Sequence, residues 1–159
     1  MANDVNLSGQ VALVTGGSRG LGRGFARGLA AAGASVAVTG QSKDALDETV
    51  RLIESASSLT SGGLRTGSRA AIAIVADVTD RAAVEQMYAD VVTAYGNVDI
   101  IVACAATGFT RKVIDLTWEE AHRTIDVCQN GVVHTCQLAA MRMVEQVEDG
   151  RAPGRMVSI

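Results

Sequence analysis

A chain of 159 residues with a formal net charge of −3 at pH 7 and only 3% aromatic residues lacks the positive field and the stacking side chains of a nucleic-acid-binding protein. Its longest apolar run, at 100–106, is too short to span a bilayer, and its first residues lack the features of a signal peptide. With 48% hydrophobic and 19% charged residues, the composition favours one packed domain over 1–159. The three cysteines are odd in number and flanked by apolar residues, which favours reduced thiols and a cytoplasmic location.

Residues 15–22, Thr-Gly-Gly-Ser-Arg-Gly-Leu-Gly, join an apolar run at 11–14 to a segment in which Leu21, Phe25 and Leu29 recur at every fourth position. This pattern predicts a buried strand, a glycine-rich turn and an apolar-striped helix. Such a turn lets backbone approach a ligand closely, and its unpaired amides and the helix dipole favour a phosphate. A glycine-rich helix start that binds nothing would show the same local pattern.

The spacing of the three glycines distinguishes this turn from two common nucleotide-binding motifs. Gly16, Gly20 and Gly22 form G-x-x-x-G-x-G, which is wider than the common dinucleotide fingerprint G-x-G-x-x-G. It also differs from the phosphate loop G-x-x-x-x-G-K-S/T.

The rest of the chain alternates between strand and helix patterns. Apolar runs predict strands at 35–39, 71–76, 100–103 and 156–159. A helix follows each of the second, third and fourth strands. The buried stripe of the first of these helices is Leu46, Val50 and Ile53, and that of the next includes Val84, Met87, Tyr88 and Val91. The last and longest helix carries Ile125, Val132, Val133, Cys136, Ala140 and Met143.

Local signals mark where these helices begin and end. Ser42 and Asp80 can cap the second and third helices, and Gly96 closes the third. Thr117 and Glu120 have the spacing of a capping box. Residues 55–69 are rich in Ser, Gly and Thr without periodicity, so we expect a flexible surface loop there.

The alternation implies an α/β fold of Rossmann type, a doubly wound parallel sheet with right-handed crossovers. In such folds a ligand binds beyond the carboxyl ends of the strands. The glycine turn, Gln41, Asp77 and Ala105 all fall at such ends.

With these residues placed, the chain resembles the short-chain dehydrogenase/reductase family of the classical type. The resemblance runs through all 159 residues. It is carried by the glycine motif, Asp77-Val78 after the third strand, Asp-Ile-Ile-Val at 99–102, Trp118 at the start of the long helix, Ile-Asp-Val at 125–127 and Gly-Arg-Met-Val-Ser at 154–158. It implies a nicotinamide cofactor and hydride transfer between an alcohol and a carbonyl compound of small-molecule size.

The resemblance implies roles for the residues around the cofactor. Within the turn that Gly16 and Gly22 frame, Ser18, Arg19, Gly20 and Leu21 would hold the diphosphate. Asp77 would bond the adenine amino group with Val78 beside it. Asp77 could instead cap a helix, although Asp80 is better placed for that role. The nicotinamide would lie near Cys104 and Ala105.

The end of the second strand bears on cofactor preference. An NAD site normally has a carboxylate there to bind the ribose hydroxyls, but this strand runs into Thr-Gly-Gln-Ser at 39–42. Arg19 adds a positive charge, as it does in relatives that use NADP, although it could also be a solvated surface arginine. NADP is therefore the predicted cofactor and NAD the alternative.

The catalytic half departs from the family. Cys104 and Cys128 stand where the family has two asparagines, the second of them catalytic, and a thiol is a weak hydrogen-bond donor. The pair could be reactive or metal-binding, but we expect buried apolar filler and no metal site. The family's catalytic Ser and Tyr-x-x-x-Lys would fall beyond Ile159, so no catalytic residue is assigned within the chain.

The sequence thus predicts the cofactor-binding portion of an oxidoreductase, with its domain truncated after the fifth strand. A sheet edge and an apolar helix face would be exposed, to be covered by further chain or by another polypeptide. The main alternative is a non-catalytic subunit that supports an active relative, and binding of another adenine-containing ligand is a third. A homo- or hetero-oligomer of related subunits is expected in either of the first two cases.

Overall fold

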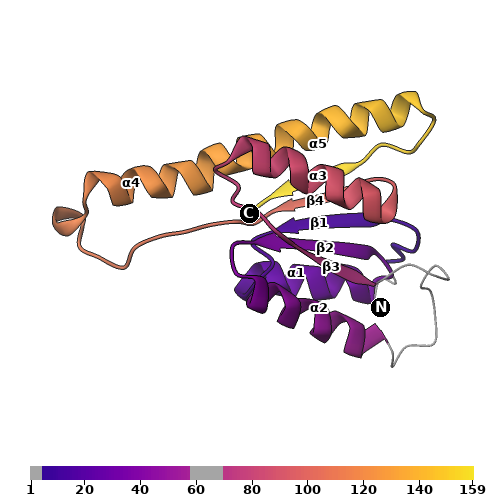
Figure 1. Ribbon diagram of the computed structural model, residues 1–159, viewed down its shortest axis with the longest axis horizontal. Helices are drawn as coiled ribbons and strands as arrows, with labels where there is room; N and C mark the ends of the chain where they lie inside the picture. The colour runs from indigo at the N-terminus through magenta and orange to yellow at the C-terminus, as the bar shows by residue number, and fades with distance from the viewer. Residues whose placement is uncertain (1–4, 58–69) are drawn as a thin grey trace.

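The computed structural model describes residues 5–57 and 70–159 and shows a parallel sheet between two layers of helices (Figure 1). The order of the strands is β3-β2-β1-β4-β5, and every neighbouring pair is parallel. The strands are β1 (Val11–Thr15), β2 (Ser35–Gly40), β3 (Ala71–Val75), β4 (Ile100–Ala103) and β5 (Arg155–Ser158). The order reverses between β1 and β4, so the predicted doubly wound sheet is confirmed, with its switch point at the carboxyl end of β1.

Helices α1 (Gly20–Ala31) and α2 (Lys43–Ser57) cover one face of the sheet, and α3 (Arg81–Tyr95) and α5 (Gly131–Glu148) cover the other (Figure 1). Successive β1 side chains point to opposite faces and feed two separate cores. Val14 packs with Leu46 and Ile53 on the first face. Leu13 packs on the second face in a cluster that includes Met87, Tyr88 and Val91.

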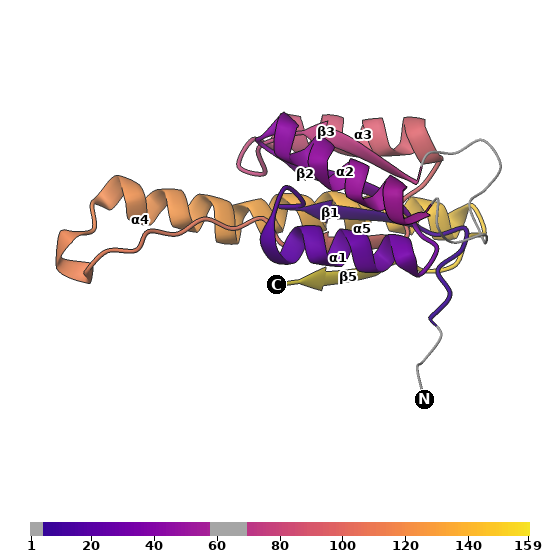
Figure 2. The same cartoon turned by 90° about the horizontal axis from the view of Figure 1, so that it is seen from below.

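Helix α4 (Trp118–Ile125) projects beyond the sheet, as two perpendicular views show (Figures 1 and 2). A short 3₁₀ turn at Val113–Asp115 precedes it, and a π-helical turn at Asp126–Asn130 joins it to α5. The single long helix predicted after Thr117 is therefore interrupted. Within the described ranges, no helix has the length and apolar character needed to cross a membrane.

The helix-end signals predicted at Asp80, Gly96 and Thr117 are confirmed. The Asp80 carboxylate accepts hydrogen bonds from the Ala82 and Ala83 amides, and Gly96 ends α3 with a φ of 87°. Thr117 and Glu120 form both bonds of the capping box.

Two predictions about helix faces and ends need correction. Leu21 is 67% exposed, and the fully buried positions of α1 are Gly22 and Ala26. At Gly22 the helix start packs against the glycine turn too closely for a larger side chain. Helix α2 continues to Ser57, where the loop was predicted to begin at Ser55. The Ser55 hydroxyl donates to the Arg51 carbonyl oxygen one turn earlier, so Ser55 is hydrogen-bonded within the helix. The remainder of the predicted loop, 58–69, lies outside the described residues.

The predicted exposure at the last strand is present. All four residues of β5 are exposed, and Met156 and Val157 remain 46% and 48% accessible. The neighbouring face of α5 exposes Val133 and Val144. A sheet edge and an apolar helix face are thus both open to solvent in this chain.

Candidate functional site

A cleft of about 640 Å³ opens at the carboxyl edge of the sheet, over the switch point between β1 and β4. The turn after β1, the ends of β2 and β3, the loop after β4, the last turn of α4 and the π-helical turn that follows it all contribute to the walls of the cleft. All eleven residues predicted to bind a cofactor line it, namely Gly16, Ser18, Arg19, Gly20, Leu21, Gly22, Gln41, Asp77, Val78, Cys104 and Ala105.

The three glycines of the motif meet different steric demands. A Cβ on Gly22 would lie 2.2 Å from the Gly16 carbonyl oxygen, so α1 packs directly on the turn. A Cβ on Gly16 would lie 2.7 Å from the Cys104 carbonyl oxygen, which brings the turn against the loop after β4. Gly20 has a φ of 57°, and a Cβ there would meet nothing within 4 Å. The cleft therefore has open space at Gly20, where a ligand could approach the backbone.

Thr15 fixes the loop after β4 from below. Its buried hydroxyl oxygen accepts hydrogen bonds from the amides of Cys104 and Ala105, each at 3.1 Å. The carboxyl ends of β1 and β4 are thereby joined beyond their ladder. The bonds that hold these two residues run from their backbone amides to Thr15 and do not involve their side chains. The loop therefore keeps its position with a cysteine at residue 104.

Asp77 sits in a polar network at the mouth of the cleft. One carboxylate oxygen accepts from the amide and the hydroxyl of Thr79, at 2.9 and 2.8 Å. The other accepts from the Gln41 side chain at 2.6 Å and from Arg123 of α4 at 3.3 Å. Burial by itself raises the pKa of Asp77, but the hydrogen bonds of Thr79 and the hydrogen bond and charge of Arg123 outweigh it, so the pKa lies below its ordinary value. The group is an ionised acceptor at neutral pH.

The end of β2 brings no carboxylate to the cleft. Gly40, Gln41 and Ser42 line it there, and Gln41 is engaged with Asp77. Arg19 lines the same region and is exposed. Within residues 5–57 and 70–159, no hydrogen bond or ion pair engages its guanidinium group, so it is available to an anion.

Val78 forms a buried apolar part of the wall. A Cβ on Gly131 would lie 2.5 Å from its side chain, so α5 packs directly on Val78. The Nδ1 atom of His134, also on α5, lies 3.1 Å from the Val78 carbonyl oxygen. His134 thus supports the wall of the cleft, a role that the sequence did not indicate.

The predicted burial of the thiol at Cys128 is wrong. Cys128 is exposed in the π-helical turn, and its Sγ donates to the Thr107 carbonyl at 3.4 Å. Its neighbour Val127 takes the buried position and lines the cleft. Cys104 is half-buried, and burial raises the pKa of its thiol. Among the described residues, no group of three or more His, Cys, Asp or Glu side chains is arranged to hold a metal ion.

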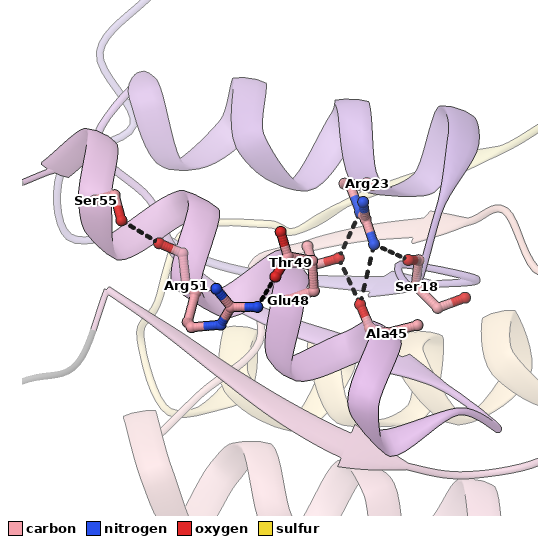
Figure 3. Close-up of polar contacts among 7 residues, drawn as sticks. All are labelled: Ser18, Arg23, Ala45, Glu48, Thr49, Arg51 and Ser55. Carbon is pink, nitrogen blue, oxygen red and sulfur yellow. Dashed lines mark hydrogen bonds and ion pairs between the residues drawn. The ribbon is translucent and has the colours of Figure 1, made fainter.

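Sequence reasoning missed two residues behind the glycine turn, Arg23 of α1 and Thr49 of α2 (Figure 3). Arg23 donates to the Ser18 carbonyl oxygen at 2.6 Å and to the Thr49 hydroxyl at 2.9 Å. The signal that could have found them is a threonine inside the apolar stripe of α2, since a buried hydroxyl needs a partner.

The comparisons with known proteins agree with this fold. The family model for short chain dehydrogenase matches residues 10–159. Sorbitol dehydrogenase of Cereibacter sphaeroides is 29% identical over 147 residues, which are 92% of this chain and 52% of the relative.

Two crystal structures show the same arrangement. A short-chain type dehydrogenase/reductase from Mycobacterium marinum has a TM-score of 0.83 and 32% identity over 97% of this chain and 56% of its own. A short chain dehydrogenase from Burkholderia cenocepacia J2315, in complex with NADP, has a TM-score of 0.79 and 36% identity over 96% and 56%. The chain spans about half the length of each of these three proteins. The family match over residues 10–159 and the shared fold show that the chain belongs to the short-chain dehydrogenase family.

Proposed function

We propose that this chain binds NADP(H) in the cleft at the carboxyl edge of the sheet and forms the cofactor site of an oxidoreductase that interconverts a small carbonyl compound and a secondary alcohol. The observation that carries the proposal is the convergence of all eleven predicted residues on that one cleft. The relatives and structures compared with the chain are named dehydrogenases, which gives the non-catalytic alternative no support.

The residues present fit such a cofactor. Gly20 leaves open space beside the first turn of α1, where backbone amides and the helix dipole favour the diphosphate. Ser18, Arg19 and Leu21 line the same part of the cleft and would hold that group with it. Ionised Asp77 would accept a hydrogen bond from the adenine amino group, with the buried side chain of Val78 beside it. The bound cofactor would supply or accept a hydride.

Two features favour NADP over NAD. The cleft has no carboxylate at the end of β2 to bind ribose hydroxyls, and Arg19 offers an unengaged positive charge. NAD remains the alternative.

Cys104 and Cys128, which stand where the family has asparagines, lie at the end of the cleft where the substrate would bind. Cys104 lines the cleft after β4, and Cys128 lies at its border beside Thr107. A thiol cannot hold a water for proton transfer as an amide can, so Cys128→Asn should raise the rate of hydride transfer where this position limits it. An unchanged rate would remove Cys128 from the proton path.

Association with a related subunit is part of the proposal. The segment that leads into α4 exposes Val113 and Ile114 at 88% and Trp118 at 71%, which is typical of an interaction surface. The three free thiols fit a reducing compartment such as the cytoplasm.

The test is a titration of NADPH and NADH, followed by cofactor fluorescence, against the natural polypeptide that carries this sequence. We expect tighter binding of NADPH. Arg19→Gln should weaken NADPH binding by roughly 1.5–3 kcal/mol, as expected for a hydrogen bond to a charged group, and leave NADH nearly unchanged. Arg27→Gln is the matched control, because Arg27 is an exposed arginine of α1 that is not among the residues lining the cleft. Absence of binding by either cofactor would refute the proposal.

A further inference from the structure

Behind the glycine turn, at the contact between α1 and α2, two side chains hold consecutive peptide groups. Figure 3 shows the bonds of Arg23 to the Ser18 and Ala45 carbonyl oxygens and to the Thr49 hydroxyl. The Thr49 hydroxyl lies 2.9 Å from the Gly17 carbonyl oxygen, and Arg23 donates to the Ser18 carbonyl oxygen at 2.6 Å. Arg23 also donates to the Thr49 hydroxyl, which joins the two contacts. We call Arg23 and Thr49, with these bonds, the turn clamp.

The clamp bonds decide where the turn's amides point. In a planar trans peptide group the carbonyl and the following N–H point in opposite directions. Because the Gly17 and Ser18 carbonyls are held on the helix side, the amides of Ser18 and Arg19 face the other way. Within the described part of the chain neither of these two amides donates a backbone hydrogen bond, and both residues line the cleft.

The clamp also ties the turn to α2. The Ala45 carbonyl oxygen, in the first turn of α2, lies 3.2 Å from the Arg23 guanidinium and 3.1 Å from the Thr49 hydroxyl. Ala45 and Ser42 border the cleft at the end of β2. The same two side chains therefore join the glycine turn to the first turn of α2.

Thr49 has no alternative partner in solvent. It is 0% exposed, and without its hydroxyl the buried Gly17 carbonyl would lose the donor that faces it. An unpaired buried carbonyl is costly, so the peptide group would rotate or shift to find another donor. Any such movement turns the Ser18 amide away from the cleft.

We propose that Arg23 and Thr49 are positioning residues, which orient the amides of the glycine turn toward the cofactor diphosphate without touching the cofactor themselves. This inference rests on the proposed function. It assigns affinity for the diphosphate to a contact between α1 and α2 outside the cleft. The guanidinium acts here by its geometry, because its fork reaches the Ser18 and Ala45 carbonyls and the Thr49 hydroxyl at once.

The test compares two ligands on matched variants of the natural polypeptide. NADPH contains the diphosphate, whereas adenosine 2′-monophosphate probes only the adenosine end of the cleft. Arg23→Gln and Thr49→Val should each raise the Kd for NADPH by at least about tenfold, the equivalent of one hydrogen bond to a charged group. The Kd for adenosine 2′-monophosphate should change less than about threefold, within the scatter of surface substitutions.

Two conservative variants separate geometry from charge and from folding. Thr49→Ser keeps the hydroxyl and should restore NADPH binding. Arg23→Lys keeps the charge but loses the fork, and it should remain as weak as Arg23→Gln. Arg27→Gln should bind both ligands as the unchanged protein does. Should Thr49→Val fail to fold, Arg23→Gln and Arg23→Lys carry the test, since Arg23 is only partly buried.

Each contrary result has a distinct meaning. Equal losses for both ligands would show a general structural role and overturn the clamp, as would full rescue by Arg23→Lys. If the unchanged protein binds NADPH and both Arg23→Gln and Thr49→Val bind it equally well, the clamp is overturned and the proposed function stands. Failure of the unchanged protein to bind NADPH and NADH would overturn the proposed function and the clamp together.

Discussion

Gly22 is the glycine on which the contact between α1 and the turn depends most closely. A Cβ built on it would lie 2.2 Å from the Gly16 carbonyl oxygen and 2.7 Å from the Gly16 carbonyl carbon. Both atoms are backbone and cannot rotate away, so an alanine at 22 must push the start of α1 off the turn. Gly24 lies two residues further along the same helix, and a Cβ there would meet nothing within 4 Å.

The two glycines therefore predict changes of opposite sign in the free energy of unfolding. Alanine in place of glycine inside a helix stabilises by about 0.5–1 kcal/mol, which is the full expectation for Gly24→Ala. For Gly22→Ala this gain is opposed by overpacking, which we place at about 3 kcal/mol because the contact is between backbone atoms. The net expectation is a loss of about 2 kcal/mol for Gly22→Ala, and a difference of about 3 kcal/mol between the variants.

Urea unfolding followed by far-UV circular dichroism measures both free energies on the natural polypeptide. NADPH titration should show weaker binding by Gly22→Ala and unchanged binding by Gly24→Ala, because only the first displaces the turn. A Gly22→Ala protein at least as stable as Gly24→Ala would refute the packing of α1 on the turn described above.

Three further substitutions or reactions test other parts of the structure. Asp77→Asn should destabilise the protein at neutral pH. The difference in unfolding free energy between the variant and the unchanged protein should shrink as the pH falls below 3.8, the ordinary pKa of an aspartate. The reason is that the pKa of Asp77 is lowered in the folded protein, so its stabilisation is lost only as the folded carboxylate is protonated. A difference independent of pH would contradict this. Tyr88→Phe removes a hydroxyl that donates to the Thr135 carbonyl at 2.8 Å inside the core, and thermal unfolding should show a loss of about 1 kcal/mol. Iodoacetamide should label exposed Cys128 before Cys104, whose burial raises its pKa, as peptide mass spectrometry would reveal; equal rates would refute the burial of Cys104.

Where an interaction is made between residues close in sequence, the sequence alone predicted it. The Asp80 cap, the Gly96 end of α3 and the capping box at Thr117 each need only the local chain, and all three form as expected. The parallel sheet was equally predictable, because alternating strand and helix patterns leave few permitted topologies. The ends of those strands then placed the predicted cofactor residues at one edge.

Tertiary contacts decided what local pattern could not. Leu21 repeats with the apolar stripe of α1, yet it is exposed and lines the cleft, while its neighbour Gly22 takes the position in close contact with the turn. Cys128 was assigned to the interior from its neighbours, and the π-helical turn rotates it outward while Val127 takes the buried position.

The support behind the cleft likewise emerged only from the folded chain. Arg23 and Thr49 are far apart in sequence and meet only when α1 and α2 lie on the same face of the sheet. Arg123 reaches Asp77 only because the α4 segment passes the end of β3. Local sequence determines which residues can form a turn or a cap, since those bonds span a few residues. Which side chains hold the turn from behind depends on distances between elements, and those distances exist only once the layers have packed.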